Sequence, residues 1–139
     1  MLYLDTCVLI PLFVQEASSN KVRDFFANNT QALSISAWSE VEFTSAMSLK
    51  VRSRQITHDS ALTAILAFRD IAEESFSILL PSPHNYHRAS EFLTHFNTGL
   101  RAGDALHLAI AHERHTTLIT SDRIMLEAAK SLKISSSPL

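Results

Sequence analysis

The segment Met1-Leu2-Tyr3-Leu4-Asp5-Thr6 decides the predicted fold, because it sets an acidic residue directly after a short apolar run. Consecutive apolar side chains are typical of a buried strand, and we predict one over Met1–Asp5. The apolar run Val8–Val14 follows and predicts a helix, with Pro11 in its first turns. A strand that leads at once into a helix is the first half of a β-α-β unit.

The rest of the chain continues this alternation of strand and helix. Further strands are predicted over Ala32–Ser36, Ser77–Leu80, Thr116–Thr120 and Lys133–Ser136, the last of them at an edge. Helices are predicted over Ser18–Asn29, Trp38–Arg54, His87–Asn97, Asp104–Arg114 and Asp122–Leu132, with one more that Thr57 or Asp59 caps and that runs to Glu74. Strands separated by helices imply a three-layer α/β/α sandwich around a mainly parallel sheet. We expect a single domain over residues 1–139.

Composition narrows the classes of function. The 139 residues are 46% hydrophobic and 19% charged with a net charge of −2, which indicates a globular protein that bulk charge does not hold on nucleic acid. Cys7 is the only cysteine, so no internal disulfide is possible and the reducing cytoplasm is the expected location. We expect neither a secretory signal nor a membrane-spanning helix, because no run of about 18 apolar residues occurs. Two glycines are too few for a glycine-rich phosphate loop.

Four acidic residues stand beside apolar runs, where a carboxylate is costly unless it is paired or binds a cation. Asp5 and Asp122 follow predicted strands. Asp104 begins a predicted helix, and Glu42 lies about one turn into the helix after the second strand. Ligands of parallel α/β sheets bind beyond the carboxyl ends of the strands, so all four can lie at one edge. Glu40 competes with Glu42 for this role but faces another side of the helix.

Each acid also has an ordinary structural interpretation. Asp104 and Asp122 at helix starts can be N-caps, and Asp5 can accept hydrogen bonds in a turn. Glu42 can pair with a nearby arginine. The joint pattern, rather than any single residue, favours a shared site.

A shared site of four carboxylates needs a cation. Two carboxylates 4 Å apart repel by about 4 kcal/mol at an effective dielectric constant of 20. Mg²⁺ and Mn²⁺ prefer oxygen ligands and keep several waters. Such an ion can lower the pKa of a water, orient it toward phosphorus and stabilise the leaving oxygen. Hydrolysis of a phosphodiester is the reaction that best uses this group of acids.

Four segments carry these acids: Leu2-Tyr3-Leu4-Asp5-Thr6, Glu42-Phe43-Thr44-Ser45-Ala46, Leu100-Arg101-Ala102-Gly103-Asp104-Ala105-Leu106-His107-Leu108-Ala109 and Thr120-Ser121-Asp122. In order, spacing and chain length they resemble the PIN domain, and most of all the VapC-type toxins of bacterial and archaeal toxin–antitoxin pairs. The third segment is the most specific of the four. The resemblance covers essentially the whole chain.

The resemblance implies a Mg²⁺- or Mn²⁺-dependent endoribonuclease that hydrolyses RNA through a metal-activated water. The positions that form the family's catalytic, metal-binding pocket are matched by Asp5, Glu42, Asp104 and Asp122. Thr6 and Thr120 match hydroxyl positions near the metal, and Cys7 stands where a serine is common. The resemblance further implies a homodimer and a cognate antitoxin that lies across the pocket and holds the toxin inactive.

Basic residues are the candidates for contact with RNA. Lys50, Arg52 and Arg54 form the only basic cluster, which can be a solvated helix end or a contact to the phosphate backbone. Arg101 and Arg123 flank two of the acids and are further candidates for backbone contact.

Histidine and cysteine allow other kinds of chemistry. His112 and His115 are spaced i, i+3, which does not match the i, i+4 spacing of a zinc-protease helix. His107 lies one turn after Asp104 and could face the pocket, but such a residue is more often a packed core histidine, and we assign it a small role. A nucleophilic role for the Cys7 thiol is disfavoured, because free cysteines are mostly buried as small apolar groups.

Two further classes of function stay open. A non-catalytic PIN-fold interaction module would bind a protein partner through apolar surface, and loss of an acid would have favoured it. A metal-dependent phosphatase or DNA nuclease would use the same acids on another substrate.

Overall fold

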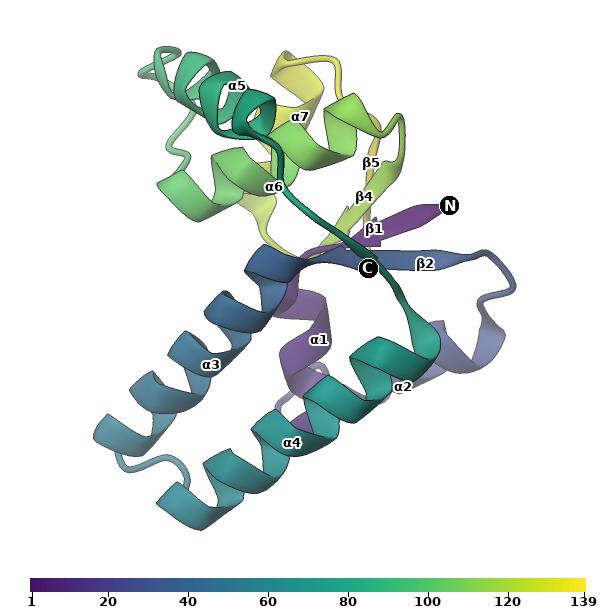
Figure 1. Ribbon diagram of the computed structural model, residues 1–139, viewed down its shortest axis with the longest axis vertical. Helices are drawn as coiled ribbons and strands as arrows, with labels where there is room; N and C mark the ends of the chain where they lie inside the picture. The colour runs from purple at the N-terminus through teal and green to yellow at the C-terminus, as the bar shows by residue number, and fades with distance from the viewer.

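A computed structural model describes residues 1–139 and contains one parallel sheet between two layers of helices (Figure 1). The sheet has the order β3-β2-β1-β4-β5, so the first strand is central. Its strands are β1 (Leu2–Leu4), β2 (Leu33–Ser36), β3 (Ser77–Leu79), β4 (Thr117–Thr120) and β5 (Ser136–Pro138). Every neighbouring pair is parallel. The predicted α/β/α sandwich is confirmed.

Seven helices cover the two faces of this sheet. They are α1 (Thr6–Phe13), α2 (Ser19–Asn28), α3 (Ala37–Arg52), α4 (His58–Ser75), α5 (Pro83–Leu93), α6 (Ala102–Glu113) and α7 (Arg123–Ser131). Strand β1 shows how the core divides: Tyr3 packs among residues of α5, α6 and α7, whereas Leu2 and Leu4 pack among residues of α1, α3 and α4. This alternation follows from the two-residue period of a strand. None of the helices has the length and apolar character that crossing a bilayer requires.

Two predicted elements differ from the structure. The helix predicted over His87–Asn97 starts and ends four residues earlier, because the Ser82 hydroxyl caps it and Pro83 occupies its first position. The last strand runs over Ser136–Pro138 instead of Lys133–Ser136. Lys133 has a φ of 57°, so it belongs to the turn after α7 and cannot extend the strand.

Helix α3 exposes an apolar side. The sequence spacing predicts a shared side for Trp38, Val41, Ser45 and Leu49. Of these, Val41 and Leu49 are 55% and 57% exposed. The side packed against the core instead carries Phe43 and Met47. Helices α3 and α4 run as a pair that extends well beyond the sheet (Figure 1), which leaves room for exposed side chains on both.

Aromatic packing joins this pair to the core. The rings of Phe43 in α3 and Phe68 in α4 stack with centroids 4.4 Å apart and an interplanar angle of 8°. Phe13 of α1 meets both rings edge-on, at 5.3 and 5.8 Å. Such aromatic contacts stabilise a core beyond the area that they bury.

We therefore expect Phe68→Ala to lower the free energy of unfolding by about 3–5 kcal/mol, since it removes a fully buried ring and leaves a cavity. Urea denaturation followed by circular dichroism measures this change. The matched control is Phe96→Ala, whose ring is 93% exposed and whose loss should change stability by less than about 0.5 kcal/mol. Equal effects of the two substitutions would contradict the assigned core.

Candidate metal centre

Asp5 lies at the carboxyl end of β1, between two central strands and the start of α1. Its backbone N–H donates to the Ile119 carbonyl of β4 at 3.0 Å, which fixes the residue against that strand. Its Oδ2 accepts hydrogen bonds from the Thr120 hydroxyl at 2.6 Å and the Cys7 thiol at 2.8 Å. Its Oδ1 faces the Cys7 backbone N–H at 3.4 Å as the N-cap of α1. Only 5% of Asp5 is exposed, so these donors replace water around a buried carboxylate.

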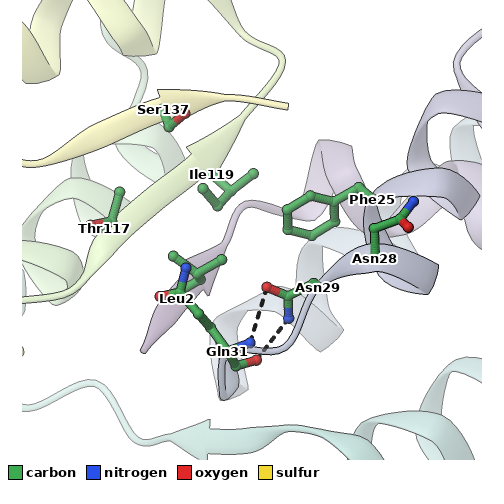
Figure 2. Close-up of a pocket in the computed structure, with 8 residues that line it drawn as sticks. All are labelled: Leu2, Phe25, Asn28, Asn29, Gln31, Thr117, Ile119 and Ser137. Atoms are coloured by element: carbon green, nitrogen blue, oxygen red, sulfur yellow. Dashed lines mark hydrogen bonds between the residues drawn. The ribbon is translucent and has the colours of Figure 1, made fainter.

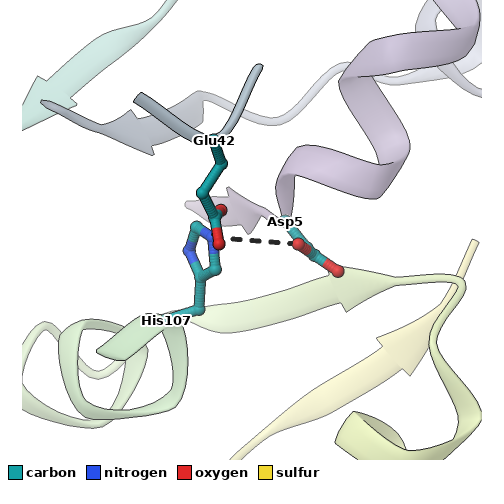
Figure 3. A group of neighbouring side chains, drawn as sticks. All are labelled: Asp5, Glu42 and His107. Atoms are coloured by element: carbon teal, nitrogen blue, oxygen red, sulfur yellow. Dashed lines mark hydrogen bonds and ion pairs between the residues drawn. The ribbon is translucent and has the colours of Figure 1, made fainter. Parts of the chain in front are cut away.

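Glu42 approaches Asp5 from the second turn of α3. Its Oε2 accepts a hydrogen bond from the Thr6 hydroxyl at 2.6 Å and lies 2.5 Å from Nε2 of His107. The same imidazole nitrogen lies 3.8 Å from Oδ1 of Asp5 (Figure 3). Asp5, Glu42 and His107 each offer one ligand atom, and these three atoms all lie within 4.8 Å of one another. The end of β1 and helices α3 and α6 therefore bring three possible ligand side chains together at one place.

Asp122 is the N-cap of α7, whereas Asp104 is the third residue of α6 and bonds back to the N-cap residue Arg101, so its possible role as an N-cap is not found. Oδ2 of Asp104 accepts the backbone N–H of Arg101 at 2.9 Å. Oδ1 of Asp122 accepts the N–H groups of Ile124 and Met125, at 2.7 and 3.1 Å. In each carboxylate the other oxygen has no hydrogen bond within the chain.

Asp104 belongs electrostatically to the same site as Asp5 and Glu42. Burial raises the pKa of its carboxyl, and the negative charges of Asp122, Asp5 and Glu42 raise it further, against the lowering effect of the Arg101 N–H. The four predicted acids are therefore close enough to sense one another.

The imidazole of His107 balances part of this negative charge. Burial raises the pKa of Glu42, but the hydrogen bond and charge of His107, together with the Thr6 hydrogen bond, act against burial, and this pKa lies below its ordinary value. Burial likewise disfavours the charged form of His107, but the Glu42 hydrogen bond and the Asp5 charge raise its pKa overall. His107 is fully buried and bonded to a site residue. The sequence assigned His107 only a small role, whereas the structure places it in contact with Glu42. Its position three residues after Asp104 puts both side chains on the same side of the helix and could have indicated this.

The hydroxyl residues link the acids. Thr6 donates to Glu42, whereas Thr120 donates to Asp5 and accepts the backbone N–H of Asp122 at 3.0 Å. Glu40 instead pairs with Arg69 at 2.7 Å, away from this group.

Other candidate chemistry finds little support in the geometry. Burial is the largest cause that raises the pKa of the Cys7 thiol to about 12, so a thiolate nucleophile is not available near neutral pH. His112 packs edge-on against Phe92, and neither it nor His115 joins a group of three metal-ligating side chains.

A groove of about 410 Å³ runs from the acids along α3. Its walls carry Glu42 and Trp38 on α3 and Arg101, Gly103 and Asp104 at the start of α6. A larger cavity of about 490 Å³ lies where α2 ends over the sheet (Figure 2). Its lining contains no titratable side chain, so the acid-lined groove is the stronger candidate for chemistry despite its smaller volume.

The predicted basic contacts divide into two groups. Arg101 lines the groove beside Asp104. Lys50 lies about 12 Å further along α3 than Glu42, at 1.5 Å per residue. It forms an ion pair with Glu16 at 2.6 Å and is thus already neutralised. Arg52 donates to Ser48 at 2.6 Å, and Arg54 follows the helix end. Arg123 is on α7 and lies 3.5 Å from Glu127.

Comparison with known proteins gives a family for this arrangement. A model of the PIN domain matches residues 2–131. The chain thus belongs to the PIN domain family. Comparison with curated proteins gives no match.

Solved structures with the same fold come from several bacteria. VapC20 of Mycobacterium tuberculosis, described as a sarcin–ricin loop cleaving toxin, aligns with a TM-score of 0.74 and 17% identity over 92% of this chain and 95% of its own. FitAcB of Neisseria gonorrhoeae aligns with a TM-score of 0.73 and 16% identity over 98% and 96%. VapBC2 of Rickettsia felis, solved with a promoter DNA fragment, aligns with a TM-score of 0.62 and 17% identity over 100% of this chain and 99% of its own. At these identities the likeness establishes the fold alone.

Gly103 gives a direct test of the site geometry. A Cβ atom built on Gly103 would lie 2.4 Å from Oε1 of Glu42, so an added methyl must displace that carboxylate. Because alanine is a good helix former, we expect Gly103→Ala to fold, with the displacement of Glu42 from its hydrogen bonds as the main cost. We also expect it to bind Mn²⁺ about tenfold more weakly, as measured by isothermal titration calorimetry. Unchanged Mn²⁺ affinity would show that the Glu42 position does not matter for binding.

Proposed function

We propose that this protein is a Mg²⁺- or Mn²⁺-dependent endoribonuclease, the toxin of a VapBC-type pair, acting in the cytoplasm. The observation that carries the proposal is the convergence of Asp5, Glu42 and His107 within 4.8 Å beside Asp104, whose pKa reflects the other acids. Perturbed acids in a groove at the carboxyl ends of parallel strands favour a catalytic site.

The donor atoms fit a hard divalent cation. Asp5, Glu42, Asp104 and Asp122 supply carboxylate oxygens, which Mg²⁺ and Mn²⁺ prefer. An ion held there supplies a water of lowered pKa and positive charge for the phosphate. Thr120 and Cys7 keep Asp5 oriented, and Thr6 keeps Glu42 oriented. These hydrogen bonds fix the ligands before an ion binds, which lowers the cost of ordering them.

RNA is the proposed substrate. The family membership and the description of VapC20 as a toxin that cleaves the sarcin–ricin loop support this choice. Arg101, on the wall of the groove, is the basic residue best placed for a phosphate next to the scissile bond. Arg52 and Arg54 would contact the RNA further along, and Lys50 contributes less because Glu16 neutralises it.

A protein partner is part of the proposal. Complexes of VapBC from Salmonella typhimurium and of VapBC-1 from Haemophilus influenzae share the fold. The exposed Val41 and Leu49 flank the acid-lined groove and offer apolar surface to an antitoxin segment that lies across it. We also propose a homodimer, for which the exposed Leu62 and Leu66 of α4 supply further apolar surface.

Metal binding can be tested by thermal unfolding in EDTA, Mg²⁺ and Mn²⁺. An ion at 100 times its dissociation constant should stabilise the wild type by about 2.7 kcal/mol, and Asp104→Asn should remove most of this gain. The raised pKa of Asp104 means that its ionised form weakens the metal-free fold as pH rises through that value. At neutral pH in EDTA, Asp104→Asn should therefore melt higher than the wild type, and the difference should vanish in acid. A lower melting point in EDTA at neutral pH would contradict the proposed repulsion.

Catalysis can be tested with Asp5→Asn on a panel of tRNA, ribosomal RNA, messenger RNA, DNA and phosphomonoesters. Loss of a group that bonds to a metal ligand costs about 10- to 100-fold, so loss of a ligand itself should slow RNA cleavage by more than about 100-fold. Asp24→Asn, an exposed aspartate on α2, is the matched control and should cleave normally. Cleavage of DNA or of phosphomonoesters alone would point to the nuclease or phosphatase alternative. A wild-type protein that cleaves none of these substrates, with or without added Mg²⁺ or Mn²⁺, would favour the non-catalytic interaction module.

A further inference from the structure

A buried chain of three side chains reaches the candidate metal centre from the middle of the sheet. The hydroxyl of Tyr3 lies 2.7 Å from Nδ1 of His107, and Nε2 of His107 lies 2.5 Å from Oε2 of Glu42. Tyr3 and His107 are both 0% exposed, whereas Glu42 opens into the groove. Strand β1, helix α6 and helix α3 supply one member each.

The chain uses both polar ends of the imidazole. The Glu42 carboxylate only accepts hydrogen bonds, so the proton of the pair lies on Nε2 and points at Glu42. Nδ1 faces the Tyr3 hydroxyl at 2.7 Å. This hydroxyl can donate to Nδ1 of a neutral ring or accept from Nδ1–H of a charged one, so it holds the ring plane in place in either state. A fully satisfied polar chain of this kind specifies one arrangement of its members.

We propose that Tyr3 and His107 are positioning residues that orient the Glu42 carboxylate and thereby raise the affinity of the acidic pocket for its divalent ion. This inference rests on the proposed metal-dependent function. Glu42 has a long, flexible side chain, and ordering it upon ion binding costs conformational entropy. The imidazole and the Thr6 hydroxyl bear that cost during folding, because both bond Oε2 in the folded chain.

Direct ligation by His107 is the competing arrangement. Its Nε2 lies within 4.8 Å of ligand oxygens of Asp5 and Glu42. However, a nitrogen that donates a proton to Glu42 has no free lone pair for a metal. A nitrogen ligand would also favour Mn²⁺ over Mg²⁺, whereas a positioning residue acts on both ions alike.

Ion affinities of the full chain and five variants test the proposal. We would titrate Mn²⁺ and Mg²⁺ by calorimetry, well below the unfolding temperature. Tyr3→Phe should weaken the binding of both ions about tenfold, as expected when a group that positions a metal ligand is lost. Tyr86→Phe removes the only other tyrosine hydroxyl, which is exposed, and should leave both affinities unchanged.

His107 variants complete the test. The amide of His107→Gln can still donate to Glu42, so this variant should stay within about threefold of the wild type, whereas His107→Leu should lose about tenfold or more. Adding Tyr3→Phe to His107→Leu should not lower the ion affinity further, because Tyr3 acts through the imidazole.

Three results would overturn the proposal. If Tyr3→Phe bound Mn²⁺ and Mg²⁺ as tightly as the wild type, the Tyr3 hydroxyl would have no effect on the site. RNA cleavage by the same wild-type protein would leave the proposed function standing. A selective loss of Mn²⁺ in His107→Gln would establish His107 as a ligand. A wild-type protein that binds neither ion would remove the proposed function together with this inference.

Discussion

Repulsion among carboxylates at the end of the central strand is the constraint on which the site depends. Asp5 is the most buried of the acids, and its two oxygens together receive the Thr120 hydroxyl, the Cys7 thiol and the Cys7 backbone N–H. Thr6 and His107 hold Glu42 near Asp5, because both form hydrogen bonds with Oε2 of Glu42. Asp104 receives only the Arg101 N–H, and its pKa is raised first by burial and then by the charges of Asp122, Asp5 and Glu42. The metal-free protein thus holds a charge distribution that a divalent ion would relieve.

Helix α3 connects this site to the rest of the molecule through three different sides. One side places Phe43 against Phe68 and secures the helix in the core. A second directs Glu42 toward Asp5 and His107. A third leaves Val41 and Leu49 exposed along the groove. A single helix therefore transmits core stability to the position of Glu42, so a loss of packing at Phe43 would also loosen the acidic site.

The sequence supports the fold and the acids well because both follow from local order along the chain. An acid after a buried strand must lie at the carboxyl edge of a parallel sheet, which is where Asp5 and Asp122 are found. Other features depend on contacts that are distant in the chain. The spacing of Val41 and Leu49 shows that they share a side but not whether another element covers it. The role of His107 depends on Tyr3, which is 104 residues away.

The structural and functional interpretations of the acids at helix starts turn out to be compatible. A carboxylate has two oxygens, and an N-cap uses one of them for the backbone N–H groups of the first turn. Asp122 caps α7 through Oδ1, and Asp104 meets the Arg101 N–H through Oδ2. The second oxygen of each carboxylate has no hydrogen bond within the chain, and the bonded oxygen limits the directions in which it can point. The positive end of each helix also offsets part of the repulsion between these acids. Hydrogen bonds to the first turns of helices are therefore a means by which this fold holds several carboxylates together, and under the proposed function they orient these acids for an ion.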